Sequence, residues 1–304
     1  MSMTDITTAL PASLPRRRGL SPQARRLRGL IRASLRQVIL WLLVMPGAIL
    51  FLIPWAWMIS TAGKETALIW KQPPVWIPPV YHFEYFAKAW KMGDFALYFR
   101  NTTFICVMAV LGVVSSSALA AYAFSRIRFP GRDVLFIVVL STMMLPMQVT
   151  LIPLYMIFSR LGWVNTLRPL TVPLFFGDAF SIFLLRQFFL TISTEYDDAA
   201  LIDGCSRIGV LFRVLLPMVR PALAVVAIFA FSWAWNDFMG PLIYINSPRL
   251  FTITLGLRRF QGRTSTDIQY LMAMTAVSTL VPIVMFFTAQ RYFIQGIVIS
   301  GIKG

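Results

Sequence analysis

The chain has 304 residues, of which 58% are hydrophobic and 13% are charged, and its mean hydropathy is +0.71. Soluble domains are about half apolar and about a quarter charged, so this composition excludes an ordinary soluble protein and indicates a membrane protein. The net charge of +16 raises the question of nucleic-acid binding. However, the basic residues flank apolar stretches and do not form one patch, which membrane topology explains better. We therefore expect this chain to lie in a lipid bilayer and not to bind nucleic acid.

Residues 1–37 form a polar, arginine-rich tail. A signal peptide has a shorter charged region, a shorter apolar core and a small-residue cleavage site, whereas the apolar run that follows here is long enough to span. The tail is therefore predicted to be retained and cytoplasmic, ahead of a membrane domain over 38–304. Residues 20–36 either form a basic helix on anionic lipid or are disordered, and the sequence leaves both open. The arginines of the tail are Arg16, Arg17, Arg18, Arg25, Arg26, Arg28, Arg32 and Arg36.

Six apolar stretches predict an all-α, polytopic fold with six transmembrane helices. A bilayer core of about 30 Å takes about 20 apolar residues in a helix to cross. Pro146 and Pro153 in the third stretch and Pro173 in the fourth are expected to kink these spans. The stretches cover residues 38–60, 102–125, 133–158, 169–190, 219–243 and 270–292.

The orientation follows from the basic residues, which gather on the cytoplasmic side of membrane proteins. With the tail inside, the short break at 126–132 is also inside and adds Arg126, Arg128 and Arg132. The last outer break, 244–269, is basic as well and reduces the excess of basic residues on the inner side. The basic residues of the tail and of the break at 126–132 nevertheless predict that both termini lie in the cytoplasm.

The break at 61–101 is the longest and is rich in proline and aromatic residues. These residues predict either a folded cap at the membrane interface or an ordinary aromatic belt, and the sequence leaves both open. The aromatic residues are Trp70, Trp76, Tyr81, Phe83, Tyr85, Phe86 and Trp90.

The break at about 191–218, between the fourth and fifth spans, has the most specific local pattern. Thr194 can cap a short helix whose first turn is acidic, which suits the positive end of the helix dipole. Gly204 is placed to end that helix, because glycine accepts the left-handed conformation that follows a helix. A second helix is predicted over about 206–215, with Pro217 ahead of the next span. The pattern indicates a compact helical knob that projects from the membrane.

This loop resembles the cytoplasmic loop of the inner-membrane permease subunits of bacterial ABC importers. Their signature is Glu-Ala-Ala, three residues, Gly, nine residues, then Ile-x-Leu-Pro. Here Asp198 stands for the glutamate and Val214 for the isoleucine. The matching residues are Asp198-Ala199-Ala200, Gly204 and Val214-Leu215-Leu216-Pro217.

Further segments narrow the resemblance to the MalG-like subunits of sugar importers, and it covers nearly everything from residue 38 onward. It implies a permease subunit of an ATP-driven sugar importer in the bacterial inner membrane. The implied partners are a second permease, two ATPase subunits that bind ATP and Mg²⁺, and an extracytoplasmic sugar-binding protein; no cofactor is implied on this chain. The segments are Pro146-Met147-Gln148, Ile152-Pro153, Ala200-Leu201-Ile202-Asp203-Gly204, Trp235-Asn236-Asp237-Phe238 and Gly301-Ile302-Lys303-Gly304.

The resemblance also implies roles for individual residues. In this family the loop before the fifth span is the coupling helix, and the extreme C-terminus, here Lys303 and Gly304, reaches toward the ATPase dimer. The residues placed at the ATPase contact are Glu195, Asp198, Ala199, Ala200, Asp203, Gly204, Leu216 and Pro217.

Candidates for the substrate path come from the side chains themselves. Asp178 and Asp237 lie within or at the edge of apolar spans, where an ionisable group is costly and therefore often functional. Asn236 and Asp237 beside Trp233 and Trp235 offer polar groups next to aromatic faces, which suits a polyhydroxylated sugar. Gln148 either lines the path or bridges a backbone bond that a proline breaks. The sequence also leaves open a structural alternative, in which Asp237 lies at the outer interface and bonds helix ends while the two tryptophans are belt or packing residues.

The alternative function is a self-sufficient secondary transporter or channel. Such a protein usually has ionisable residues deep in several spans or two similar halves. Only Asp178 lies clearly inside a span, and no repeat is visible. The sequence also has no His/carboxylate metal cluster, no serine or cysteine paired with a histidine, and no phosphate loop. We therefore expect no catalytic residues and no metal, with ATP hydrolysis left to partner subunits.

Overall fold

The computed structural model describes residues 22–261 and 267–301, and in these ranges every element is a helix, as predicted. The chain divides into two units, residues 1–56 and 57–304. Among the described residues, four helices are long and apolar enough to cross a membrane, or up to six if each of two bent helix pairs is one span. The number of six spans therefore stays a prediction.

The first unit is a single helix in its described part. Helix α1 runs over Pro22–Ala62 and continues into the second unit. Its Ser34–Ala62 part is long and apolar enough to cross a bilayer, and side chains such as Phe51 are exposed. The helix has no break near residue 37, so residues 22–36 are helical, as one of the two alternatives for the basic segment supposed.

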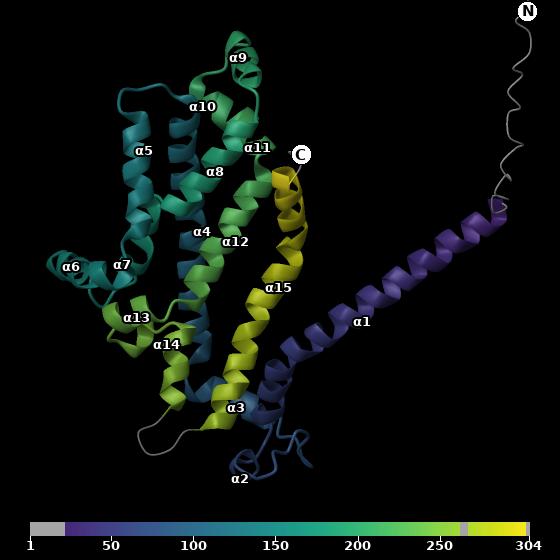
Figure 1. Ribbon diagram of the computed structural model, residues 1–304. Coiled ribbons are helices and arrows are strands. Elements are labelled where there is room, and N and C mark those ends of the chain that lie inside the picture. The colour runs from purple at the N-terminus through teal and green to yellow at the C-terminus, as the bar shows by residue number, and fades with distance from the viewer. Residues whose placement is uncertain (1–21, 262–266, 302–304) are drawn as a thin grey trace, which may run out of the picture. The chain divides into compact units, whose positions relative to one another are not determined.

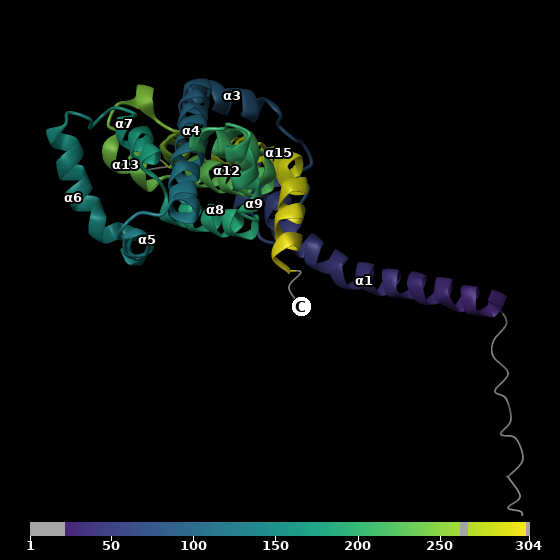
Figure 2. The ribbon, with the colours of Figure 1, turned by 90° about the horizontal axis from the view of Figure 1, so that it is seen from above.

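The second unit is built around helix α4, Phe95–Arg126. Helices α8 (Ala179–Thr191) and α12 (Arg220–Asn236) and the 3-10 helix η2 (Val172–Phe176) pack along α4, and α15 (Ile268–Gly301) packs on α12. The long helices α4, α12 and α15 run side by side (Figures 1 and 2). Figure 1 places α9 at one end of this unit and α2 and α3 at the other.

Small residues let the neighbours of α4 come close to it. A side chain at Gly112 would place its Cβ 3.0 Å from the backbone of Leu174, so η2 lies directly against the α4 backbone. Helices in lipid associate through such close packing, because lipid tails are as apolar as the side chains. Residues spaced four apart form one buried ridge on α4: Ala109, Val113, Ser117 and Ala121.

Prolines bend or interrupt the third and fourth predicted spans, as expected. The third consists of α5 (Arg132–Ser141), η1 (Thr142–Met144) and α6 (Met147–Arg160), and its halves meet at 100°. Pro146 lies at this bend, whereas Pro153 lies inside α6 without breaking it. The fourth begins with α7 (Arg168–Thr171) and turns into η2 around Pro173 before α8 starts.

The fifth predicted span, 219–243, is wrong as one continuous helix. Helix α12 ends at Asn236, and a separate short helix α13 (Met239–Tyr244) follows. The carboxylate of Asp237 accepts a hydrogen bond from the Gly240 N–H at 3.1 Å, which satisfies a backbone donor at the start of α13. The apolar composition of the stretch concealed this break.

The segment before α15 is tied to α4. It holds η4 (Pro248–Leu250), α14 (Ile253–Leu257) and η5 (Arg258–Phe260). The Asn101 side chain of α4 donates to the carbonyls of Arg249 and Phe251, both at 3.0 Å. The Thr102 hydroxyl accepts from the Ile253 N–H at 2.9 Å. The N-terminal half of α4 therefore fixes this loop.

The break at 61–101 is folded, as one of its two alternatives predicted. It holds α2 (Thr66–Ile69) and α3 (Glu84–Met92). His82 lies between two carboxylates, with Nδ1 2.8 Å from Glu84 and Nε2 3.3 Å from Glu65, and its ring stacks on Tyr85. The hydrogen bond to Glu84 raises the pKa of His82 above its ordinary value, and Glu65 adds to this.

Replacing Gly112 by valine is expected to lower stability by about 1–3 kcal/mol, because the added side chain must push the Leu174 backbone away from α4. Thermal unfolding of the purified protein in detergent measures this. Gly47→Val is the matched control, since a Cβ at Gly47 meets nothing within 4 Å. Equal unfolding temperatures for the two variants would contradict the close packing of α4 against η2.

The His82 contacts predict a pH dependence of stability. Because the folded-state pKa of His82 lies above its ordinary 6.5, its contribution is fully present below that ordinary value and is lost as the pH rises through the raised pKa. The unfolding temperature of the wild type should therefore fall, relative to that of His82→Gln, as the pH is raised from 5.5 to 8.5. Parallel curves for the two proteins would show that the contacts do not stabilise the protonated ring.

Candidate functional site

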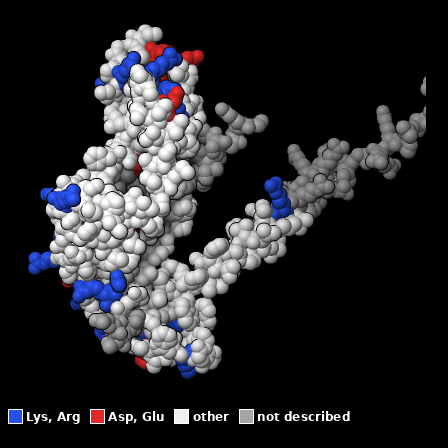
Figure 3. All heavy atoms as spheres, turned by 60° about the vertical axis from the view of Figure 1, so that its left-hand side comes forward, with Lys and Arg blue, Asp and Glu red and all other residues white. Residues whose placement is uncertain are grey.

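The loop between α8 and α12 folds into a helical knob, which we define as residues 194–218. It contains α9 (Glu195–Ile202), α10 (Arg207–Gly209), a π-helical turn η3 (Val210–Leu215) and α11 (Leu216–Met218). Helix α9 forms one extremity of the second unit (Figure 1). Charged side chains gather at this extremity and again toward the opposite end, with a band of uncharged surface between them (Figure 3).

Gly204 ends α9, as predicted. Its φ is +83°, in the left-handed region that favours glycine. The Cys205 N–H donates to the Ala200 carbonyl at 2.9 Å, and the Gly204 N–H donates to the Leu201 carbonyl at 3.1 Å. This pair of bonds is the Schellman motif, which satisfies carbonyls at the end of a helix. A Cβ at Gly204 meets nothing within 4 Å, so the backbone conformation alone requires glycine here.

The start of α9 corrects the prediction for Thr194. Thr194 occupies the N-cap position, but its side chain makes no capping bond because its backbone is already helical, with φ −66° and ψ −17°. Side-chain capping needs an extended residue at this position. The Ser193 hydroxyl accepts from the Glu195 N–H at 3.3 Å instead.

The second helical segment of the knob begins close to its predicted start of about 206 but runs on beyond 215. It covers 207–218, so Pro217 precedes the next span, as predicted, but lies inside α11. Ser206 caps it by accepting from the Gly209 N–H at 3.1 Å. Proline lacks the N–H that an α-helix uses, and one wider turn precedes it, in which the Leu216 N–H reaches the Leu211 carbonyl. The segment then meets α12 at 83°.

The residues predicted to contact an ATPase fall into two groups. Ala200 is buried, and Leu216 and Pro217 are half-buried, so these three hold the knob together. Apolar side chains such as Ile202 and Ile208 are also exposed on the knob. The predicted residues that lie on its surface are Glu195, Asp198, Ala199, Asp203 and Gly204.

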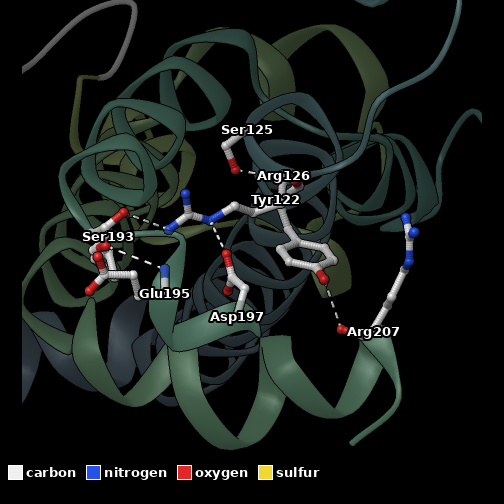
Figure 4. A network of polar contacts seen from close by, with 8 residues as sticks. Tyr122, Ser125, Arg126, Ser193, Glu195, Asp197 and Arg207 are labelled. Atoms are coloured by element: carbon white, nitrogen blue, oxygen red, sulfur yellow. Dashed lines mark hydrogen bonds and ion pairs between the residues drawn. The ribbon is translucent and has the colours of Figure 1, made fainter. Parts of the chain in front are cut away.

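A buried ion pair joins the knob to α4, and sequence reasoning missed it. Arg126 Nε lies 2.8 Å from Asp197 Oδ2, and the two side chains are 7% and 14% exposed. The same guanidinium donates to the Ile192 carbonyl at 2.8 Å. One turn earlier on α4, the Tyr122 hydroxyl donates to the Arg207 carbonyl at 2.9 Å. Figure 4 shows these side chains converging on the two helices of the knob.

Burial dominates the electrostatics of this pair. It raises the pKa of Asp197 above its ordinary value, and Asp198 adds to the effect, although Arg126 opposes it. Burial thus costs the charged carboxylate more hydration than the attraction of Arg126 compensates. Removing one member of such a pair leaves the other charge buried without compensation, which is usually strongly destabilising.

Two of the substrate-path candidates line one pocket. Asp178 and Trp233 both face a pocket of about 320 Å³ between α4, residues 173–181 and α12. Asp178 also caps α8, since its carboxylate accepts from the Ser181 N–H at 2.8 Å and from the Ser181 hydroxyl at 2.6 Å. The pocket therefore carries a carboxylate, a hydroxyl and an indole ring.

The remaining candidates lie elsewhere. Asn236 and Gln148 are exposed and Asp237 is half-buried, and none of them lines the pocket that Asp178 shares with Trp233. The Asn236 amide donates to the Ser232 carbonyl within α12 at 2.8 Å. Lys303 and Gly304 lie outside the described residues. Within the described ranges, no group of three or more His, Cys, Asp or Glu side chains could hold a metal ion.

Residues 112–299 match the family model of the binding-protein-dependent transport system inner membrane component. The chain belongs to this family. A relative from Bacillus subtilis named "Probable ABC transporter permease protein YurM" is 37% identical over 83% of each chain. The "Trehalose/maltose transport system permease protein MalG" of Thermococcus litoralis is 33% identical over 84% of this chain and 93% of its own. The "Diacetylchitobiose uptake system permease protein NgcG" of Streptomyces coelicolor is 31% identical over 87% and 86%.

Solved structures share the fold. The structure described as a bacterial ABC transporter "involved in the import of the acidic polysaccharide alginate" superposes with a TM-score of 0.71 at 22% identity, covering 90% of this chain and 99% of that chain. A second alginate transporter structure, in complex with a pentasaccharide-bound periplasmic protein, gives a TM-score of 0.56 at 15% identity, covering 87% and 93%. The all-helical fold of this chain is thus the one found in these two transporter structures.

Gly204→Val is expected to destabilise the knob by about 1–2 kcal/mol, because a β-branched residue is strained at φ +83°. Hydrogen exchange of the amides over residues 194–206 in detergent should become faster, while exchange in α4 stays unchanged. Gly204→Asn is the control, since asparagine tolerates the left-handed region. If both variants exchange like the wild type, the turn does not depend on glycine.

Proposed function

We propose that this chain is a permease subunit of an ATP-driven carbohydrate importer and that its knob docks on an ATPase subunit. The observation that carries the proposal is the signature Asp198-Ala199-Ala200, Gly204 and Leu216-Pro217 on a folded knob at one extremity of a permease fold. Relatives named for arabinooligosaccharides, diacetylchitobiose and trehalose/maltose support a sugar as the substrate class.

The proposed topology has six transmembrane helices with both termini in the cytoplasm of a bacterium, in its inner membrane. Counting each bent pair as one span gives this number. The break at 127–131 follows α4 at the same end as the knob, and its flanking arginines favour the cytoplasm for that end. Residues 1–37 are then a cytoplasmic tail and 38–304 the membrane domain.

The proposed complex contains a second, related permease, two ATPase subunits and an extracytoplasmic sugar-binding protein. Support comes from the family description, which names binding-protein dependence, and from the similar fold in a structure with a periplasmic protein. The ATPase subunits would bind ATP and Mg²⁺, and this chain would hold no cofactor. No nucleic acid takes part.

In the proposed mechanism, ATP binding closes the ATPase subunits, the knobs held in their grooves move with them, and the membrane helices rock between inward- and outward-facing states. Glu195, Asp198 and Asp203 would supply charges at the contact, while Ala199 and Gly204 allow close approach. Ala200, Leu216 and Pro217 keep the knob in shape. We also propose that Lys303 and Gly304 reach the ATPase dimer.

The pocket shared by Asp178 and Trp233 is the favoured substrate contact on this chain. A carboxylate and a hydroxyl beside an indole ring suit the polar edges and apolar face of a sugar ring. Gln148, Asn236 and Asp237 remain proposed path residues, which the partner permease would complement. A self-sufficient transporter or channel would instead have to move the sugar without any ATPase, and reconstituting the purified chain alone tests that alternative.

Ala199→Trp is expected to prevent docking, because Ala199 is exposed on α9 and a large ring there keeps the ATPase groove away. Co-purification with the ATPase and ATP-dependent uptake should each fall at least about tenfold, which corresponds to about 1.4 kcal/mol. Uptake is measured in cells with a labelled panel of maltose, trehalose, arabinotriose and diacetylchitobiose, with the gene deleted and restored.

The matched control is Ala87→Trp, an exposed alanine on α3 at the opposite end of the unit, which should leave ATPase co-purification unchanged. Normal co-purification and uptake by Ala199→Trp, at normal expression, would contradict docking through the knob.

A further inference from the structure

At both ends of the knob, the chain interrupts or bends the helix that leads to the membrane helices. Toward α8, the chain leaves the helix at Ile192, which is extended with φ −87° and ψ 132°. Toward α12, the helical segment bends by 83° next to Val219. Neither covalent connection therefore continues a helix of the knob straight into α8 or α12.

The polar contacts to α4 supply a third support. Tyr122 and Arg126 are one turn apart on α4, so their side chains lie on the same face. Arg126 holds Asp197 in α9, and Tyr122 holds the Arg207 carbonyl at the start of α10. Because the two contacts reach different helices of the knob, they fix its orientation as well as its distance from α4.

The chemistry of Arg126 suits a stiff joint. Its planar guanidinium makes the ion pair with Asp197 and the hydrogen bond to the Ile192 carbonyl at the same time, and its donors keep a fixed geometry that a lysine lacks. Both side chains are largely covered, and charge interactions are stronger there than at an open surface. The contact therefore spans the extended junction at Ile192.

We propose that Arg126, Asp197 and Tyr122 are the positioning residues that transmit the movement of the knob to α4 and thereby couple ATP hydrolysis to transport. The proposal rests on the docking function proposed above. Helix α4 is suited to receive the movement, because α8, η2 and α12 all pack along it. Apolar side chains of the knob also pack in one buried cluster with α4, α8 and α12, and the polar link adds a directional contact to that packing.

The test uses the full complex, purified with its ATPase, and compares the hydrolysis rate with uptake of the labelled sugar panel in cells. In Arg126→Gln and Asp197→Asn, uptake should fall at least about tenfold while ATPase co-purification and basal hydrolysis stay within about twofold. Tyr122→Phe should give a smaller loss. Arg126→Lys keeps the positive charge but not the planar guanidinium. Its uptake should lie between that of the wild type and that of Arg126→Gln.

Two further variants separate transmission from simple folding. The exchanged pair Arg126→Asp with Asp197→Arg should restore at least a third of wild-type uptake, because the attraction is rebuilt with its direction reversed. Arg132→Gln is the matched control. It removes an arginine at the same end of the second unit as the knob, where Arg132 pairs with its sequence neighbour Asp133 at 3.0 Å. This variant should leave uptake unchanged.

Two outcomes would overturn the link. One is wild-type uptake per hydrolysed ATP in both single variants. The other is loss of ATPase binding in the single variants with no rescue by the exchanged pair, which would make the residues part of the fold of the knob only.

A measurement on the chain alone keeps the link distinct from the docking function. Spin labels at Ile202 on α9 and Leu111 on α4, both exposed, are introduced with Cys106 and Cys205 replaced by serine. Their distance distribution should be narrow and should broaden in Arg126→Gln. An unchanged distribution would refute the stiff joint even if docking holds, whereas a wild-type chain that binds no ATPase would refute docking alone.

Discussion

The close packing on helix α4 is the constraint on which the rest of the structure depends. Its ridge of small residues, with Gly112 against the Leu174 backbone, allows α8, η2 and α12 to share one central helix. In lipid, where the hydrophobic effect does not drive helices together, such contacts and interhelical hydrogen bonds are what holds a bundle. Polar side chains near the two ends of α4 then contact other segments. Asn101 fixes the loop before α15 at one end, and Arg126 fixes the knob at the other.

The knob explains why the family signature has its spacing. The two alanines of the signature have different surroundings, since Ala199 is exposed and Ala200 is buried. The glycine comes where α9 must reverse, and only its positive φ requires that residue. The leucine and proline belong to the second helical segment, whose π turn and bend return the chain to α12. The signature thus encodes a fold at least as much as a contact surface.

Much of this architecture could be predicted from the sequence because it depends on local rules. The apolar stretches gave helices, Pro146 marked a bend, and Gly204 marked the end of α9. The failures have two physical origins. The break at Asp237 and the missing cap at Thr194 depend on local backbone geometry that the residue types do not reveal. The pairing of Arg126 with Asp197 depends on the packing of α4 beside α9, which are far apart in the sequence. In the sequence, Arg126 by itself indicates only which side of the membrane the break lies on, and Asp197 by itself indicates only the acidic first turn of a helix.

The ion pair raises the question of why a chain with so few charged residues buries two of them at this joint. Well-packed apolar side chains of similar size often stabilise a fold as much or more, because burial of charges costs hydration, and the raised pKa of Asp197 reflects that cost. An apolar contact, however, tolerates sliding, whereas the Arg126 guanidinium attracts the Asp197 carboxylate and also donates a hydrogen bond to the Ile192 carbonyl. In the proposed link, these two contacts limit the movement of the knob relative to α4. In the proposed link, the pair therefore serves to position the knob on α4 and not chiefly to stabilise the fold.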